Sequence, residues 1–199
     1  MTRPIVKGVF AEHNISNPIK HIAEDQNPID FILKNNQTLS IKTNQRKLGK
    51  AAPQNIGQPT AETYWKYFSD FADGAIPADY KSKAKMFKRV SIARIDEVLT
   101  RYWENIFDCD MLIHFYDFLD KDGKLKSEPK YIVLNKKESP VWRREKITFT
   151  QNLNTWNESN TVKYCGVSIG EFQVHNNRNC FKFRFNMDGL SYLIEEHVI

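Results

Sequence analysis

The sequence predicts an α/β fold of the α+β kind, with a central mixed β-sheet flanked by helices. Apolar and polar residues alternate within the strands of two expected hairpins, one between residues 29 and 42 and one between residues 168 and 186, which is the period of half-buried strands. Apolar residues recur at steps of three and four between residues 84 and 107, which is the period of a helix. The 199 residues, 41% of them hydrophobic, suit a globular chain that buries a core. We therefore expect a single domain spanning 1–199.

The elements are expected in the following order. The apolar spacing over residues 8–22 predicts a helix, which Pro18 is expected to break or kink. Next come a hairpin and two helices, at 30–42, 61–71 and 84–107. Strands are expected at 109–119, 131–134 and 146–150, and a polar loop at 152–160. The chain closes with a hairpin, 168–175 paired with 180–186, and a short helix, 188–197. Helices on either side of a sheet are the expected result.

The composition limits the cellular locations and the binding partners that are expected for this chain. No apolar run approaches the ~18 residues that cross a bilayer, and residues 1–14 lack the pattern of a secretory signal. The three cysteines, Cys109, Cys165 and Cys180, show no CxxC spacing, which favours a reducing cytoplasm over a zinc site. The net charge of +5 is compatible with a polyanionic partner.

Basic residues gather in two clusters. One contains Lys42, Arg46, Lys47 and Lys50. The other contains Lys81, Lys83, Lys85, Lys88 and Arg89. For this second cluster two interpretations stay open, a solvated helix face and contact with phosphate groups.

The first hairpin brings a carboxylate and an ammonium together. Ile29, Phe31 and Leu33 point to one face, so Asp30 points to the other. On the return strand, Ser40 and Lys42 are the polar members of an alternation with apolar neighbours. A carboxylate is a ligand that Mg²⁺ prefers, and an ammonium stabilises charge that develops on a phosphate. The pattern therefore indicates a metal-dependent phosphodiesterase, and the alternative for Asp30 is a strand-edge aspartate without a ligand.

This hairpin resembles a known family signature. Pro28-Ile29-Asp30, followed after nine residues by Ser40-Ile41-Lys42, resembles the PD-(D/E)xK motif of type II restriction endonucleases. Ser40 stands where that family usually has an acidic residue. The resemblance implies Asp30 as a Mg²⁺ ligand, Lys42 beside the attacking water or scissile phosphate, and the Ser40 hydroxyl or carbonyl near the metal. It also implies a second carboxylate on the preceding helix. Glu12 is the candidate, and a solvated helix face is its alternative.

The segment after this hairpin offers amide and basic side chains. Gln54 and Gln58 bracket a short loop around Gly57, and their amides suit the orientation of a scissile strand or water. The alternative for both glutamines is helix capping or turn closure. Asn44 and Lys47, at the end of the return strand, are further candidates for DNA contact.

The C-terminal hairpin is a candidate for DNA recognition. Planar and basic side chains occupy one face and the turn, namely Gln173, His175, Asn177, Arg178, Lys182 and Arg184, with Glu171 beside them. Arginine and lysine suit guanine, glutamine and asparagine suit adenine, and a two-stranded ribbon fits the major groove. The stretch also resembles the C-terminal part of such restriction endonucleases. The alternative is an ordinary amphipathic hairpin with a solvated face.

The expected function is that of a type II site-specific deoxyribonuclease that cleaves double-stranded DNA with Mg²⁺ as cofactor. A palindromic target implies a homodimer. The family implies a bacterial cytoplasmic enzyme with a cognate DNA methyltransferase as companion. Two alternatives stay open: a structure-selective repair or recombination nuclease on the same core, and a DNA-binding protein without catalysis.

Overall fold

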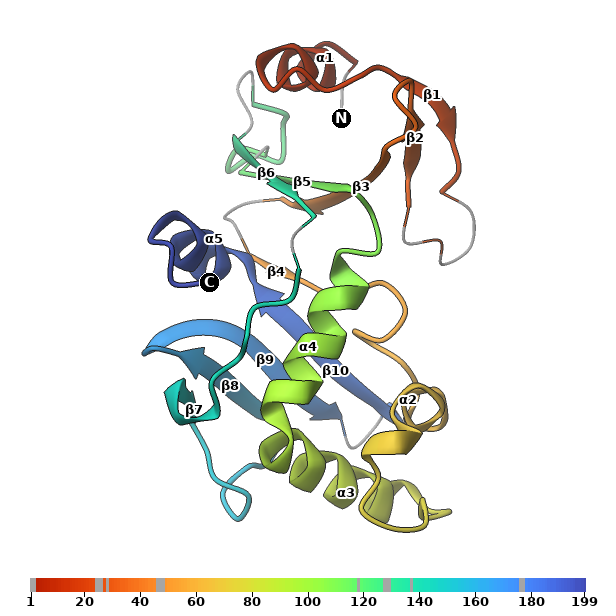
Figure 1. Cartoon of the computed structure of the whole chain (residues 1–199), viewed down its shortest axis with the longest axis vertical. Coiled ribbons are helices and arrows are strands. Elements are labelled where there is room, and N and C mark those ends of the chain that lie inside the picture. The colour runs from red at the N-terminus through yellow and green to blue at the C-terminus, as the bar shows by residue number, and fades with distance from the viewer. Residues whose placement is uncertain are drawn as a thin grey trace. The chain divides into compact units, whose positions relative to one another are not determined.

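A computed structural model describes residues 3–23, 27, 29–45, 49–117, 119–126, 130–136, 138–175 and 178–199. The predicted mixture of helices and strands is confirmed, and the strands form two five-stranded sheets, the first with one helix against it and the second with several (Figure 1). The chain divides into two compact units. The first contains Met1–Gly49 and Phe107–Lys137, and the second contains Lys50–Ile106 and Glu138–Ile199. Each unit is therefore built from two separate segments of the chain.

The first unit contains one helix and a mixed sheet. Its elements are α1 (Arg3–Glu12), β1 (Pro18–His21), β2 (Phe31–Leu33), β3 (Thr38–Asn44), β5 (Met111–Tyr116) and β6 (Lys130–Asn135). The strand order is β1-β2-β3-β5-β6. β3 and β5 run parallel, and the other neighbours are antiparallel. The predicted first hairpin is confirmed as β2–β3, in which Phe31 pairs with Leu39.

The core of this unit lies between α1 and one face of the sheet. It contains Val9, Phe10, Ile15, Leu33, Leu39, Met111, Ile113 and Phe115. The strand residues among them fill alternate positions, so the side chains between them, including Ser40, Lys42 and His114, belong to the opposite face. The alternation of side chains along the strands thus gives this sheet one apolar, buried face and one polar face.

The predicted helix over residues 8–22 is wrong in its second half. α1 ends at Glu12 because Asn14 takes a left-handed conformation, with φ of 52°, and the Ile15 amide donates to the Phe10 carbonyl at 2.8 Å. Residues 18–21 instead form β1, which pairs with β2. Pro18 lies at the first position of this strand, where the missing N–H donor is tolerated.

The second unit contains helices and an antiparallel sheet. Its helices are α2 (Ala61–Tyr67), η1 (Ser69–Phe71), α3 (Tyr80–Ala93), α4 (Ile95–Ile106), η2 (Arg144–Lys146) and α5 (Met187–Glu195). Its strands are β4 (Lys50–Ala51), β7 (Ile147–Phe149), β8 (Ser159–Tyr164), β9 (Val167–His175) and β10 (Cys180–Asn186), in the order β4-β10-β9-β8-β7. The predicted C-terminal hairpin is confirmed as β9–β10, whereas β4 and β8 were not predicted.

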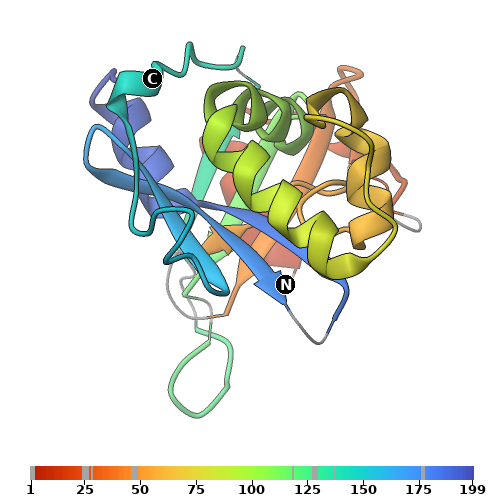
Figure 2. The same ribbon diagram turned by 90° about the horizontal axis from the view of Figure 1, so that it is seen from below.

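Aromatic side chains join the helices to this sheet. Tyr102 of α4 stacks on Phe183 of β10 with ring centroids 4.2 Å apart. Phe87 of α3 stacks on Phe181 at 4.4 Å. Figure 2 shows α3 and α4 together on one side of these strands. Aromatic pairs of this kind add to the apolar area that they bury, so this interface is the main core of the unit.

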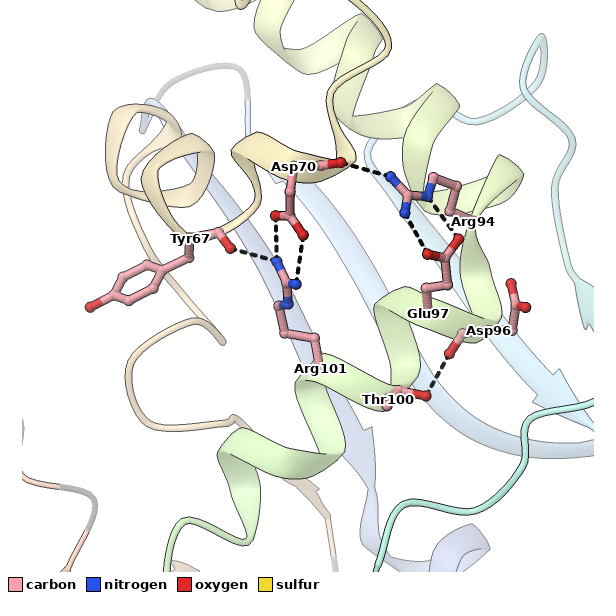
Figure 3. Close-up of polar contacts among 7 residues, drawn as sticks. All are labelled: Tyr67, Asp70, Arg94, Asp96, Glu97, Thr100 and Arg101. Atoms are coloured by element: carbon pink, nitrogen blue, oxygen red, sulfur yellow. Dashed lines mark hydrogen bonds and ion pairs between the residues drawn. The ribbon is translucent and has the colours of Figure 1, made fainter.

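The single helix expected over residues 84–107 is two helices. α3 ends at Ala93, the backbone of the next residue, Arg94, leaves the helical region with ψ of 38°, and α4 begins at Ile95. Figure 3 shows how the junction is held: Arg94 pairs with Glu97 and donates to the Asp70 carbonyl at 2.9 Å. Arg101 grips the Asp70 carboxylate through two bonds of 2.7 and 2.8 Å. Both guanidinium groups also lie over the Phe71 ring.

The last helix lies very close to β9. A Cβ atom on Gly189 of α5 would stand 1.9 Å from the Ser168 carbonyl oxygen, so only glycine fits there. In the part of the chain that the structure describes, no helix has the length and apolar character needed to span a membrane.

Candidate functional site

The carboxylate of Asp30 is held by the neighbouring strand. Its Oδ2 accepts from the Ile41 amide at 2.6 Å and from the Ser40 hydroxyl at 3.4 Å. Its own amide donates to the Leu39 carbonyl at 2.9 Å, which extends the β2–β3 pairing by one residue. These bonds use Oδ2 and not Oδ1. Asp30 is thus oriented by the main chain of β3, with one oxygen outside these bonds.

Lys42 lies on the polar face of β3 and is partly desolvated. Burial lowers the pKa of its ammonium, and the charges of Asp30 and Cys109 oppose that shift. The hairpin therefore brings the predicted carboxylate and ammonium together on one face, as the alternation indicated. Buried Ser40, only 2% exposed, lies between them in sequence and on the same face.

His114 is a neighbour of Lys42 that the sequence interpretation did not include. It faces Lys42 across the parallel β3–β5 pair and is 1% exposed. Its Nε2 lies 2.6 Å from Asn44 Oδ1, an oxygen that also accepts from the Gly49 amide at 3.2 Å. Burial and the charge of Lys42 lower the pKa of His114 to about 4. At neutral pH the ring is therefore uncharged, and it donates from Nε2 to Asn44.

Cys109 also approaches this face, and its chemistry is that of a buried thiol. It is 3% exposed, and burial raises its pKa to about 11, although Lys42 acts in the opposite direction. A thiol that stays protonated at neutral pH is a poor nucleophile. Cys109 therefore belongs to the packing around Lys42 rather than to covalent chemistry.

Glu12 lies away from this pair of residues. Its carboxylate accepts a hydrogen bond from the Tyr131 hydroxyl, which raises the pKa of that tyrosine to about 12. Tyr131 packs against the core on the α1 side of the sheet, whereas Lys42 lies on the other side. The structure thus does not bring Glu12 to Asp30. Within the described ranges, no three His, Cys, Asp or Glu side chains gather into a group that suits a metal ion.

The donor set beside Lys42 nevertheless suits a hard cation. Asp30 offers carboxylate oxygens, and Ser40 offers a hydroxyl next to them. Mg²⁺ prefers oxygen ligands and is commonly held by one or two carboxylates while it keeps several waters. The chemistry of these donors is therefore compatible with Mg²⁺, for which Asp30 would be the principal protein ligand.

The polar face of the β9–β10 hairpin is organised around Glu171. This carboxylate is 8% exposed and pairs with Lys50 and, at 3.6 Å, with Arg184. It also accepts a hydrogen bond from the side-chain amide of Gln173 at 2.9 Å. Lys182 faces Gln173 across the hairpin. The single negative charge of Glu171 stands against the positive charges of Lys50, Arg184 and Lys182, so this face remains basic.

His175 and Arg178 lie where the hairpin turns. Burial and the nearby charges of Lys182 and Arg178 lower the pKa of His175. Its Nε2 is buried without a hydrogen-bond partner among the described residues, and so is the Nε of Arg184. Arg178 is exposed. His175 and Arg178 thus lie at the turn end of the hairpin that the sequence assigned to DNA contact, and Arg184 lies further along it, opposite Glu171.

The remaining residues predicted to contact DNA lie in different parts of the structure. Asn44 is engaged by His114, as described above. Gln54 and Gln58 are exposed in the second unit, on a loop whose main chain follows β10: the Phe183 amide donates to the Gly57 carbonyl at 2.8 Å. A Cβ on Gly57 would stand 2.4 Å from the Pro53 oxygen, so the close approach is within the loop itself. Lys47 and Asn177 lie outside the described residues.

One curated protein is similar to most of this chain. It is the type II restriction enzyme CviAII of Paramecium bursaria Chlorella virus 1, and it is 31% identical over 178 residues. The match covers 84% of this chain and 44% of the relative, so the chain spans less than half the length of that protein. No family model and no solved structure matches the chain.

Proposed function

We propose that this protein is a sequence-specific double-stranded DNA endonuclease of the type II restriction class, which hydrolyses phosphodiester bonds with Mg²⁺. The observation that carries the proposal is the juxtaposition of Asp30, which directly precedes β2, and Lys42 of β3 on the polar face of the first sheet. The similarity to a restriction enzyme over most of the chain supports it independently. The variant PD-(D/E)xK motif, with Ser40 in place of an acid, is part of the proposal.

Each residue of the hairpin has a distinct role in this mechanism. Asp30 would hold a Mg²⁺ ion, which would supply charge neutralisation and a more acidic water. The Ile41 amide and the Ser40 hydroxyl hold the Asp30 carboxylate in one orientation. Lys42 stabilises the charge that develops on the phosphate in the transition state. Glu12, held by Tyr131 on the other side of the sheet, is not retained as a ligand.

The DNA contacts of this proposal come mainly from the basic hairpin face. They are assigned to Gln173, His175, Asn177, Arg178, Lys182 and Arg184. Gln54, Gln58, Asn44 and Lys47 remain candidates for the approach to the scissile strand. An arginine contributes most where it makes two bonds to guanine, so Arg184 and Arg178 are the expected base readers.

The proposal extends to partners and setting. Two copies acting together on a palindromic target would form a symmetric dimer. A cognate methyltransferase would protect the host DNA, and both proteins would act in the cytoplasm of a bacterial cell.

Cleavage of unmethylated phage DNA with Mg²⁺ tests the proposal. Wild-type protein is expected to give discrete fragments, whereas Asp30→Asn and Lys42→Met are expected to lose roughly 10²–10⁴-fold in rate. Asp122→Asn and Lys121→Met, on an exposed turn of the same unit, are matched controls that keep full activity.

Other outcomes identify the alternatives. Smeared or branch-specific products from the wild type would favour a repair or recombination nuclease. Tight, salt-sensitive binding without cleavage would favour a DNA-binding protein, for which the serine at position 40 is the supporting observation. Undiminished cleavage by Asp30→Asn would remove the proposed active site.

A further inference from the structure

The second basic cluster, residues 81–89, contains two cations that form ion pairs with carboxylates and three that do not, among the described residues. Lys83, 7% exposed, pairs with Glu62 at 3.0 Å. Arg89 grips both oxygens of Asp73. These two cations are neutralised within the protein.

Lys81, Lys85 and Lys88 recur at steps of four and three residues and therefore share one face of α3. They line a groove of about 360 Å³ together with Tyr80, Ala84 and Val174. Among the described residues, none of the three lysines has a carboxylate within ion-pair distance. Three positive charges thus border one groove without a described counter-charge.

Lys88 gives this groove a fixed cation. Its ammonium donates to the main-chain oxygens of Trp156 and Asn157, at 2.8 and 2.7 Å, and lies over the Trp156 ring. Burial lowers its pKa. An ammonium has three donors, so these two bonds leave one for a ligand. An anion in the groove would offset the desolvation of this charge.

The groove adjoins the end of the β9–β10 hairpin. Tyr80 donates its hydroxyl to the His175 carbonyl at 2.6 Å and stacks on Phe181. Val174, which lines the groove, directly precedes His175. Asp79, the acidic residue next to Tyr80, caps the helix by accepting from the Ser82 amide at 2.8 Å. The groove therefore lies at the turn end of the hairpin, on the face of the sheet that carries Val174, and the side chains of β9 and β10 assigned to base contact belong to the opposite face.

We propose that this groove binds phosphate groups of the DNA backbone that flank the bases contacted by the hairpin. The inference rests on the proposed function. Lysine suits this role because its ammonium is a compact point charge, and phosphate contacts fix the register of a protein on the duplex without reading sequence. The groove would position the hairpin, whereas the hairpin would select the site.

The salt dependence of DNA binding measures these contacts. In the full chain, the double variant Lys81→Gln/Lys85→Gln is expected to lower the slope of log affinity against log salt by about 2, because each lost phosphate contact lowers it by about 0.9. Its cleavage sequence is expected to stay unchanged. The control Lys66→Gln/Lys146→Gln removes two exposed lysines elsewhere in the same unit and is expected to keep the wild-type slope.

Acetylation of lysines, read by mass spectrometry with and without duplex DNA, locates the contact directly. Lys81, Lys85 and Lys88 are expected to be protected by DNA, and Lys66 and Lys146 are not. Equal slopes for both double variants, or protection by inorganic phosphate but not by DNA, would overturn the inference. If those results come with site-specific cleavage, the proposed function stands. If the wild type does not bind DNA, both fail.

Discussion

A nearly buried histidine beside a lysine has to remain uncharged, and this determines what His114 contributes. His114 is opposite Lys42 in the β3–β5 pairing, and its ring bonds Asn44 on the same face. A second positive charge there would meet both Lys42 and the cost of burial. The neutral ring instead fixes Asn44, which in turn holds the Gly49 amide after β3. His114 is thus a positioning residue for the strand that carries Lys42.

This state of His114 predicts acid sensitivity. The pKa is about 4 in the folded protein against 6.5 for an ordinary histidine, so the unfolded chain takes up the proton first. The contribution of neutral His114 to the free energy of unfolding is fully present above pH 6.5 and is lost as the pH falls toward 4. Between pH 7.5 and pH 5.0 the loss is roughly 2 kcal/mol. Urea unfolding at both pH values measures it.

His114→Gln is expected to lack this part of the pH dependence, whereas His197→Gln, at an exposed position, keeps it. His175, whose pKa is also lowered, is the same in all three proteins. An identical loss of stability in wild type and His114→Gln would show that the ring is protonated in the fold.

Residues within one hairpin were predictable, and residues joined by distant pairing were not. Asp30 and Lys42 share a face because side chains alternate along strands that a short turn connects. His114 reaches Lys42 through a parallel pair whose strands are far apart in sequence. The signal for it was one polar residue inside the apolar run 111–116. Glu12 followed from the family resemblance, and its bond to Tyr131 was not visible in the sequence.

Two helices each contain a glycine, and replacing both glycines by alanine distinguishes the effect of packing from the effect of helix propensity on stability. Gly189 of α5 abuts the Ser168 carbonyl, whereas a Cβ on Gly8 of α1 would meet nothing within 4 Å. Alanine is favoured over glycine within a helix by about 0.5–1 kcal/mol. Gly8→Ala is therefore expected to raise the stability of the protein by that amount. Gly189→Ala is expected to lower it by roughly 1–3 kcal/mol, because α5 has to move away from β9.

Midpoints of urea unfolding for the two variants test this contrast. The predicted shifts are opposite in sign although the substitution is the same. A rise in the midpoint of Gly189→Ala would mean that α5 does not lie against β9 in solution.

Local patterns predicted the elements where local interactions determine them. Both hairpins follow from alternation and polar turns. The periodicity over residues 84–107 could not reveal the break at Arg94, because the apolar spacing continues across it and tertiary contacts with Asp70 hold the junction. The two residues of β4 form a strand only because β10 pairs with them. The pairing partner, rather than the segment's own sequence, determines such an element.

The division into two units also depends on distant contacts. The length of the chain predicted a single domain. In the structure, however, segments before residue 50 pair with segments after residue 106 to make the first sheet. No composition shift marks the three crossings of the chain between units. Whether the whole chain works as one nuclease domain remains a prediction.

At the scale of the molecule, the proposed restriction activity predicts a dimer on its target. Light scattering of the protein with a duplex that carries the cleavage site is expected to give two chains per duplex, each of 23.3 kDa. A duplex of scrambled sequence is the control. One chain per specific duplex, with cleavage intact, would contradict a symmetric dimer and favour successive nicking of the two strands.

The interleaved chain has a consequence for biosynthesis. Helices α2, α3 and α4 leave the ribosome before β9 and β10, whose aromatic residues cover Phe87 and Tyr102. At ordinary rates of translation the apolar faces of these helices wait on the order of ten seconds for their sheet. During that interval the nascent chain is a substrate for chaperones and for aggregation. Yield in a host should therefore improve when chaperones that bind nascent chains are added, although the finished protein is unchanged.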